Sequence, residues 1–167
     1  AQTNHHLNQV VHNSLWVTGH FHFTLGITVA LTFFGIVYWL VPHLSGRVLT
    51  PKMNKIGIIQ TVMWTVGMIF MAGAMHWVGL LGSPRRTSYS TYGDNATALG
   101  WEPYLFFLAI GGTLLMIAVI LMVYIVFHLM FKAPKGNTEF PVAETDGTKN
   151  TPKWTQNWGI VVAMLII

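Results

Sequence analysis

Charged side chains are missing from three long stretches of this 167-residue sequence. Asp, Glu, Lys and Arg do not occur before Arg47, between Lys55 and Arg85, or between Glu102 and Lys132. Each stretch contains an apolar run of about 20 residues or more, which is the length that a helix needs to cross the hydrocarbon core of a membrane. Charged residues make up 8% of the chain, against about a quarter in soluble domains. The sequence therefore predicts an integral membrane protein.

The pattern predicts a single membrane domain fragment over residues 1–167 with an all-α, multi-pass helical bundle fold. Backbone polar groups find no water inside a bilayer, so the apolar segments are expected to be helices. Three segments are long enough to span and a fourth is truncated; they cover residues 15–41, 56–81, 104–131 and 158–167. Residues 132–157 are expected to form a solvated loop. We expect a piece of a longer protein, because the last residues stop inside an apolar run.

Loop charges predict the orientation of the bundle. The loop 42–55 carries three positive residues and no acid, and the loop after the third span carries four lysines. The positive-inside rule places both loops on the cytoplasmic side. The loop 82–103 is then outside, and its Arg85 and Arg86 are positive charges on the side where few are expected. They are either surface arginines or residues held by an anionic partner.

Composition argues against several other classes of protein. The chain contains no cysteine, which excludes disulfides, thiolate metal sites and a cysteine nucleophile within it. No basic patch is interleaved with aromatic residues, so nucleic acid is not an expected partner. The lipid bilayer is the expected surrounding of the apolar segments.

His20 and His22 lie inside the first apolar segment, in the stretch HNSLWVTGHFHF. On an α-helix their side chains point about 200° apart and differ in height by about 3 Å. They cannot chelate one ion, since same-face pairs need spacings of three or four residues. They can bind two separate partners on the two sides of the helix, and imidazole suits iron, copper, nickel and zinc. Spacing alone leaves open that both are simply hydrogen bonded to neighbouring helices.

Three longer strings carry a family resemblance. They are VVHNSLWVTGHFH, YWLVPHLSG and, one span later, HWVGLLGSPRR. Together they resemble the C-terminal part of subunit I of the haem–copper oxygen reductases, the cytochrome c oxidase family, and are most similar to its B-type branch. The resemblance runs through the first three spans, roughly over residues 10–131. The combination of GHFH and PRR at this separation is specific, whereas either motif alone would be weak.

The resemblance implies roles for six residues around two haems. His20 would be the ligand of the high-spin haem iron, where oxygen is reduced beside a copper, and His22 that of the low-spin haem iron. Phe21 would lie between the two haems. The haem propionates would be bound by Arg85 and Arg86, and His12 would lie near the propionates of the high-spin haem.

The sequence departs from the family pattern at two positions and contains other histidines. Asn8 stands where some B-type members have an aspartate, and the pair His12–Asn13 lacks the His-Asp pair of the A-type enzymes. Adjacent histidines at 5 and 6 resemble copper ligands, but they precede the span and are not expected to bind copper. His76 is expected to be a hydrogen-bonded structural residue near the outer boundary.

Other parts of the implied enzyme have no counterpart in this sequence. The copper ligands and the second axial ligand of the low-spin haem are expected on earlier helices of the same subunit. The resemblance implies as partners the rest of subunit I, a subunit II with a copper electron-entry centre, and cytochrome c or a similar donor. The fragment alone is therefore expected to be inactive.

The implied function is that of a terminal respiratory oxidase in a prokaryotic cell membrane. The complete protein would reduce oxygen to water with electrons from cytochrome c and would pump protons. One alternative is a nitric oxide reductase or dismutase of the same superfamily. Two others come from different classes: a non-catalytic membrane cytochrome b, and a channel or transporter with structural histidines.

Overall fold

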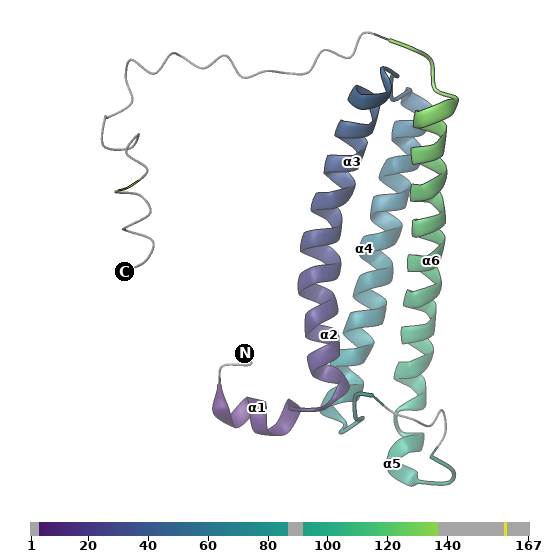
Figure 1. Cartoon of the computed structure of the whole chain (residues 1–167). Coiled ribbons are helices and arrows are strands. Elements are labelled where there is room, and N and C mark those ends of the chain that lie inside the picture. The colour runs from purple at the N-terminus through teal and green to yellow at the C-terminus, as the bar shows by residue number, and fades with distance from the viewer. Residues whose placement is uncertain (1–3, 87–91, 137–158, 160–167) are drawn as a thin grey trace.

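The computed structural model describes residues 4–86, 92–136 and 159, which contain three long helical rods lying side by side (Figure 1). Each rod is long and apolar enough to cross a membrane, over Leu15–Ser45, Pro51–Leu80 and Glu102–Phe131. The elements in chain order are α1 (His5–Val11), α2 (Leu15–Phe23), η1 (Thr24–Val29), α3 (Ala30–Ser45), α4 (Pro51–Leu80), α5 (Ala96–Leu99) and α6 (Glu102–Phe131). The predicted all-α membrane bundle is confirmed. The fourth apolar segment and residues 137–157 lie outside the described residues, apart from Gly159.

The helices extend beyond the apolar segments at several ends. α3 continues through Pro42 to Ser45 and ends at Gly46, whose left-handed φ of 61° is easily adopted by a glycine. α4 begins at Pro51, and the Thr50 side chain caps it by accepting a hydrogen bond from the backbone of the first turn. Hydropathy marks only the part of a helix that is apolar, so these polar end turns were not included in the predicted spans.

The first rod changes its helical geometry directly after the two histidines. η1 is a π-helix of six residues between α2 and α3, a form that often occurs at functional sites. The Trp64 indole of α4 donates a 2.7 Å hydrogen bond to the Gly26 carbonyl within η1. Inside a membrane such a bond between helices stabilises a carbonyl that water cannot reach. α4 is therefore tied directly to the π-helical segment.

α4 packs most extensively against α6, and small residues let the two backbones approach. A Cβ atom added to Gly111 would lie 2.6 Å from the Gly67 carbonyl oxygen and closer still to the Met71 backbone nitrogen. Close contact through small residues is the usual way in which membrane helices associate. Met68, Ala72 and Leu115 form the buried core of this interface.

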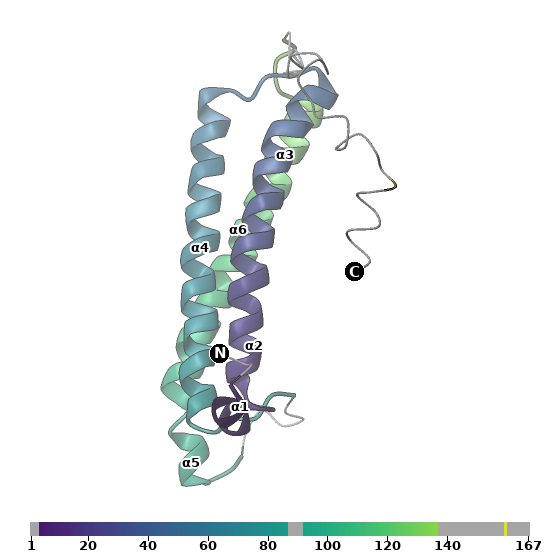
Figure 2. The ribbon, with the colours of Figure 1, turned by 90° about the vertical axis from the view of Figure 1, so that its left-hand side faces the viewer.

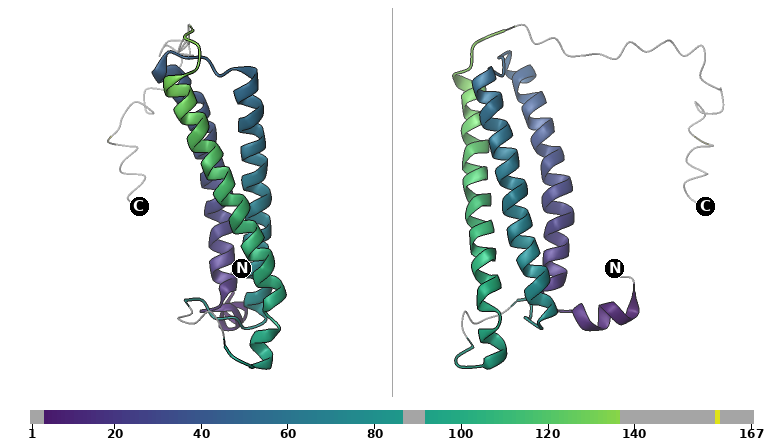
Figure 3. Two further views of the ribbon diagram at one scale, coloured as in Figure 1. Left: turned by 90° about the vertical axis from the view of Figure 1, so that its right-hand side faces the viewer. Right: turned by 180° about the vertical axis from the view of Figure 1, so that it is seen from behind.

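At the end of the bundle away from α1 and α5, α3 packs against α6 (Figure 1). Ile125 and Leu129 of α6 are fully buried and pack with Tyr38 and Val41 of α3. Figures 2 and 3 show α3 leaning toward α6 at this end, while α4 stands apart where it begins. The Arg47 guanidinium donates to the Ala133 carbonyl, so the two loops at this end are also joined.

Candidate functional site

The two histidines of the first rod lie on a regular α-helix. α2 covers Leu15–Phe23, and the Ser14 hydroxyl caps its start by accepting a hydrogen bond from the Trp16 amide. Because His20 and His22 are both within this α-helical stretch, the expected separation of about 200° and about 3 Å applies to them. Both side chains are half-buried. The π-helix begins only at Thr24, after both histidines.

The His22 ring is held by its own helix. Its Nδ1 atom lies 2.8 Å from the Thr18 carbonyl oxygen, one helical turn earlier. A carbonyl can only accept, so Nδ1 carries the proton, and in the neutral ring the lone pair is then on Nε2. Among the described residues none is hydrogen bonded to that Nε2 atom. Histidines that bind metal commonly donate their second N–H to a carbonyl in this way.

The His20 ring has aromatic neighbours and no hydrogen-bond partner among the described residues. Trp16 stacks on it with ring centroids 5.3 Å apart and an angle of 9° between the planes. His76 of α4 meets it edge-on, at 6.3 Å and 85°. The two histidines of α2 thus have different surroundings, which is what independent partners require.

A cavity of about 690 Å³ opens beside His20, between the first rod and α4. Its lining combines apolar surface with a few polar groups, which is typical of cofactor pockets. The lining residues are His20, Phe23, Thr24, Ile27, Thr28, Gly73, His76 and Trp77. Of the two α2 histidines, His20 lines this cavity and His22 does not.

Phe21 points away from the bundle. Its side chain is 61% exposed, whereas Gly19 on the same helix is buried against α4. This exposed aromatic ring lies on the part of α2 that no described helix covers. Its position leaves it available to a group or helix outside the described residues.

The two arginines lie on a turn that is joined to the start of α2. The Arg85 amide donates to the Asn13 carbonyl (2.9 Å), and the Leu15 amide donates to the Ser83 carbonyl (2.9 Å). The Arg85 side chain adds a 2.9 Å bond from Nε to the Asn13 amide oxygen. Sequence reasoning missed this role of Asn13, because nothing local in the sequence indicates a contact between the two loops.

Arg86 follows in a strained backbone conformation. Its φ of 60° is in the left-handed region, which is uncommon for residues other than glycine, asparagine or aspartate and frequent at functional sites. The Arg86 side chain is exposed and that of Arg85 is half-buried. His12, also exposed, immediately precedes the Asn13 that Arg85 contacts. The structure therefore brings the predicted His12 and Arg85 to one end of the bundle.

The adjacent histidines of the N-terminal segment lie apart from this site. His5 and His6 are on the exposed helix α1, and His5 is hydrogen bonded to the Gln9 side chain at 3.0 Å. Within residues 4–86, 92–136 and 159, no three His, Asp or Glu side chains gather into a metal-binding group. The location of the copper ligands on other helices of the subunit stays a prediction.

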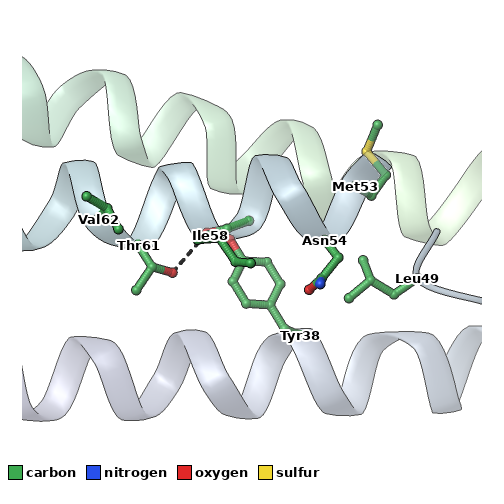
Figure 4. Close-up of a pocket in the computed structure, with 8 residues that line it drawn as sticks. Tyr38, Leu49, Met53, Asn54, Ile58, Thr61 and Val62 are labelled. Atoms are coloured by element: carbon green, nitrogen blue, oxygen red, sulfur yellow. Dashed lines mark hydrogen bonds between the residues drawn. The ribbon is translucent and has the colours of Figure 1, made fainter. Parts of the chain in front are cut away.

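A second cavity of about 190 Å³ lies between α3 and the first half of α4 (Figure 4). Tyr38 points across it from α3 (Figure 4). The Tyr38 hydroxyl donates a 2.7 Å hydrogen bond to Gln60 Oε1. Gln60 is completely buried, and its Nε2 atom has no partner among the described residues. This polar pair is roughly 25 Å along the helix from His20. It joins α3 to α4 and is separate from the histidine site.

Comparison with known proteins finds relatives among the oxidases. The chain is 36% identical over 142 residues to "Cytochrome c oxidase subunit 1" of Thermus thermophilus, covering 83% of this chain and 25% of that protein. It is 26% identical over 152 residues to "Alternative cytochrome c oxidase subunit 1" of Bradyrhizobium diazoefficiens, covering 88% of this chain and 24% of that protein. The chain thus spans about a quarter of the length of these relatives.

A solved structure and a family model agree with these relatives. The fold is similar to a chain in the cryo-EM structure of a heme-copper terminal oxidase dimer, with a TM-score of 0.75 and 29% identity, over 99% of this chain and 29% of that one. The family described as "Cytochrome C and Quinol oxidase polypeptide I" matches residues 1–114, which is more than half of the chain. The chain therefore belongs to the family of cytochrome c and quinol oxidase polypeptide I.

Proposed function

We propose that this chain is a haem-holding segment of the catalytic subunit of a B-type terminal respiratory oxidase. The observation that carries the proposal is the pair of histidines on α2, each half-buried and each in different surroundings. His22 keeps Nε2 uncommitted because its Nδ1 bonds the Thr18 carbonyl. His20 lines the open cavity between the first rod and α4, beside apolar side chains of both. The membership of the chain in the oxidase family supplies the class of cofactor.

In this proposal each histidine holds one haem iron. His22 would hold the iron of the low-spin haem and His20 that of the high-spin haem. The imidazole donors fit haem iron, and the bond from His22 to Thr18 fixes its tautomer and ring orientation. The bound haems, with a copper held elsewhere in the subunit, supply the electron transfer and the reduction of oxygen to water.

The turn that carries Arg85 and Arg86 binds the haem propionates. A guanidinium matches a carboxylate through paired, charge-assisted hydrogen bonds. Arg85 is already oriented by Asn13, and its remaining N–H groups can be donated to an anion. His12 lies on the adjoining loop and would be a further neighbour of the propionates. Phe21, exposed on α2, would lie between the two haems.

The remaining parts of the machinery belong to other segments and chains. The proposal places the copper ligands and the second low-spin ligand in the rest of subunit I. A subunit II with a copper centre would deliver electrons from cytochrome c or a similar donor. The complete protein would lie in a prokaryotic cell membrane and pump protons.

A carbon monoxide difference spectrum of the complete, reduced protein tests this function. An oxidase contains one six-coordinate haem and one five-coordinate haem, and only the latter binds carbon monoxide. We expect a carbon monoxide signal from one of two haems, together with copper by metal analysis. A protein with two haems and no carbon monoxide signal would instead be an electron-transferring cytochrome b, and a colourless protein would contradict haem binding altogether.

Replacing either arginine with glutamine is expected to lower the haem reduction potentials. Loss of a positive charge near the propionates makes the reduced, more negative site less favourable. For Arg85→Gln or Arg86→Gln in the full protein, we expect a fall on the order of 60 mV, which corresponds to about a tenfold change in the equilibrium of a one-electron couple. Redox titration with optical detection measures it. Lys52→Gln, at the other end of the bundle, is the control, and unchanged potentials in both arginine variants would contradict propionate binding.

A further inference from the structure

We propose that His76 of α4 is a positioning residue that fixes the ring orientation of His20. This inference rests on the proposed ligation of the high-spin haem by His20. From the sequence we expected only a structural role for His76, near the outer boundary. In the structure its ring lies against the His20 ring and lines the same cavity.

The geometry of three rings carries the proposal. His20 and Trp16 are nearly parallel, with 9° between their planes. The His76 ring stands almost perpendicular to both, at 85° to His20 and 81° to Trp16, with centroids 6.3 Å and 5.2 Å away. Trp16 therefore covers one face of the His20 ring while His76 contacts the pair from the neighbouring helix. Edge-to-face contacts of this kind stabilise a defined mutual orientation.

His76 is itself fixed in place. Its Nδ1 atom is 2.6 Å from the Ala72 carbonyl oxygen, and because that oxygen can only accept, Nδ1 carries the proton. Phe23 adds another edge contact, at 5.7 Å and 73°. A ring held by a hydrogen bond and by packing on two sides has little freedom to rotate. It can therefore limit the rotation of the His20 ring that it touches.

The helices approach closely at this point. A Cβ atom added to Gly19 would lie 2.9 Å from His76 Nδ1 and 2.8 Å from the Ala72 carbonyl oxygen. Gly19 directly precedes His20. The backbone next to His20 is therefore in close contact with Ala72 and His76 of α4. A polar imidazole inside a membrane helix is costly where packing alone is needed. The Nδ1–H bond to the Ala72 carbonyl offsets this cost and fixes the ring, which an apolar ring could do only through packing.

The orientation of an axial imidazole affects the iron that it binds. Replacing a residue that orients a metal ligand through a hydrogen bond commonly changes metal affinity or activity about 10–100-fold. His76 contacts His20 by ring packing alone, so its effect is expected near the lower end of that range. His76 therefore acts through His20 on the high-spin haem, and not on the low-spin haem. The two haems provide an internal comparison in any experiment.

Three variants of the complete oxidase, assembled with its partner subunits, test the proposal. His76→Leu removes both the ring and the bond to Ala72, while His76→Phe keeps a ring of similar shape and loses only the bond. His43→Leu is the matched control, because His43 makes the same kind of Nδ1 bond to a carbonyl one turn earlier but lies at the other end of the bundle. Resonance Raman spectroscopy of the reduced protein reads the iron–histidine stretching band of the high-spin haem.

We expect His76→Leu to shift and broaden this band and to lower turnover by about tenfold, the lower end of the range for residues that orient a metal ligand, with the low-spin spectrum retained. His76→Phe should stay closer to the unmodified protein, and His43→Leu should match it. An unchanged band in His76→Leu, or equal damage to both haems in both His76 variants, would overturn the positioning role. His20→Ala tests the haem assignment separately. If the iron–histidine band persists in this variant, His20 is not the ligand of the high-spin haem.

Discussion

Replacing His22 with alanine in the complete protein is expected to remove the low-spin haem signal and leave the five-coordinate haem in place. His20→Ala should do the reverse and abolish carbon monoxide binding while more of the low-spin signal survives. The reason is geometric, since the two side chains leave α2 about 200° apart and have different neighbours. Each variant therefore removes the axial ligand of a different iron. Optical and electron paramagnetic resonance spectra of both variants measure the result.

The same experiment has a matched control on another helix. His5 is exposed on α1, where its side chain bonds Gln9, so His5→Ala should keep both haem signals. Some damage to the second haem is expected in each α2 variant, because the ligands differ in height by only about 3 Å. If both variants lose the same haem, or both keep native spectra, the proposal that α2 holds one haem on each side is wrong.

Replacing Gly111 with alanine is expected to destabilise the bundle severely. The new Cβ atom would lie 2.6 Å from the Gly67 carbonyl oxygen and 2.8 Å from Met71 Cβ. These neighbours include backbone that cannot move without separating α4 from α6. Overpacking commonly costs about 1–3 kcal/mol, and we expect about 3 kcal/mol here, seen as a lower midpoint of thermal unfolding in detergent.

Gly112 offers a control one residue away. A Cβ atom at this position meets nothing within 4 Å, so Gly112→Ala introduces the same chemical change without a clash. We expect its unfolding midpoint to equal or exceed that of the unmodified protein, because alanine favours a helix over glycine by about 1 kcal/mol. Equal midpoints for the two variants would show that α4 and α6 are not in close contact at Gly111.

Hydropathy predicted the number and approximate position of the long helices, but not their ends or their internal geometry. The polar turn from Pro51 to Lys55 is helical although its charges interrupt the apolar run. The π-helix η1 escaped prediction for a different reason. Its six residues are apolar or small on every side, so no periodicity distinguishes a wider turn from an ordinary one.

In the candidate site, local geometry could be predicted from the sequence, whereas contacts between different helices could not. The relation between His20 and His22 depends only on local helix geometry, and the spacing of two residues was sufficient to infer it. The contacts of Asn13 with Arg85, and of His76 with His20, join residues that are far apart in the sequence. They depend on how two rods are placed against each other, which no local pattern encodes.

The backbone bonds between the arginine turn and the start of α2 have a consequence for how this protein can change during evolution. Surface loops usually tolerate insertions and deletions. Here Ser83 and Arg85 pair with Leu15 and Asn13 in a fixed register, so one added or removed residue in either loop would move the guanidinium groups relative to the imidazoles. The lengths of these two loops are therefore coupled to each other, and a change in one requires a compensating change in the other.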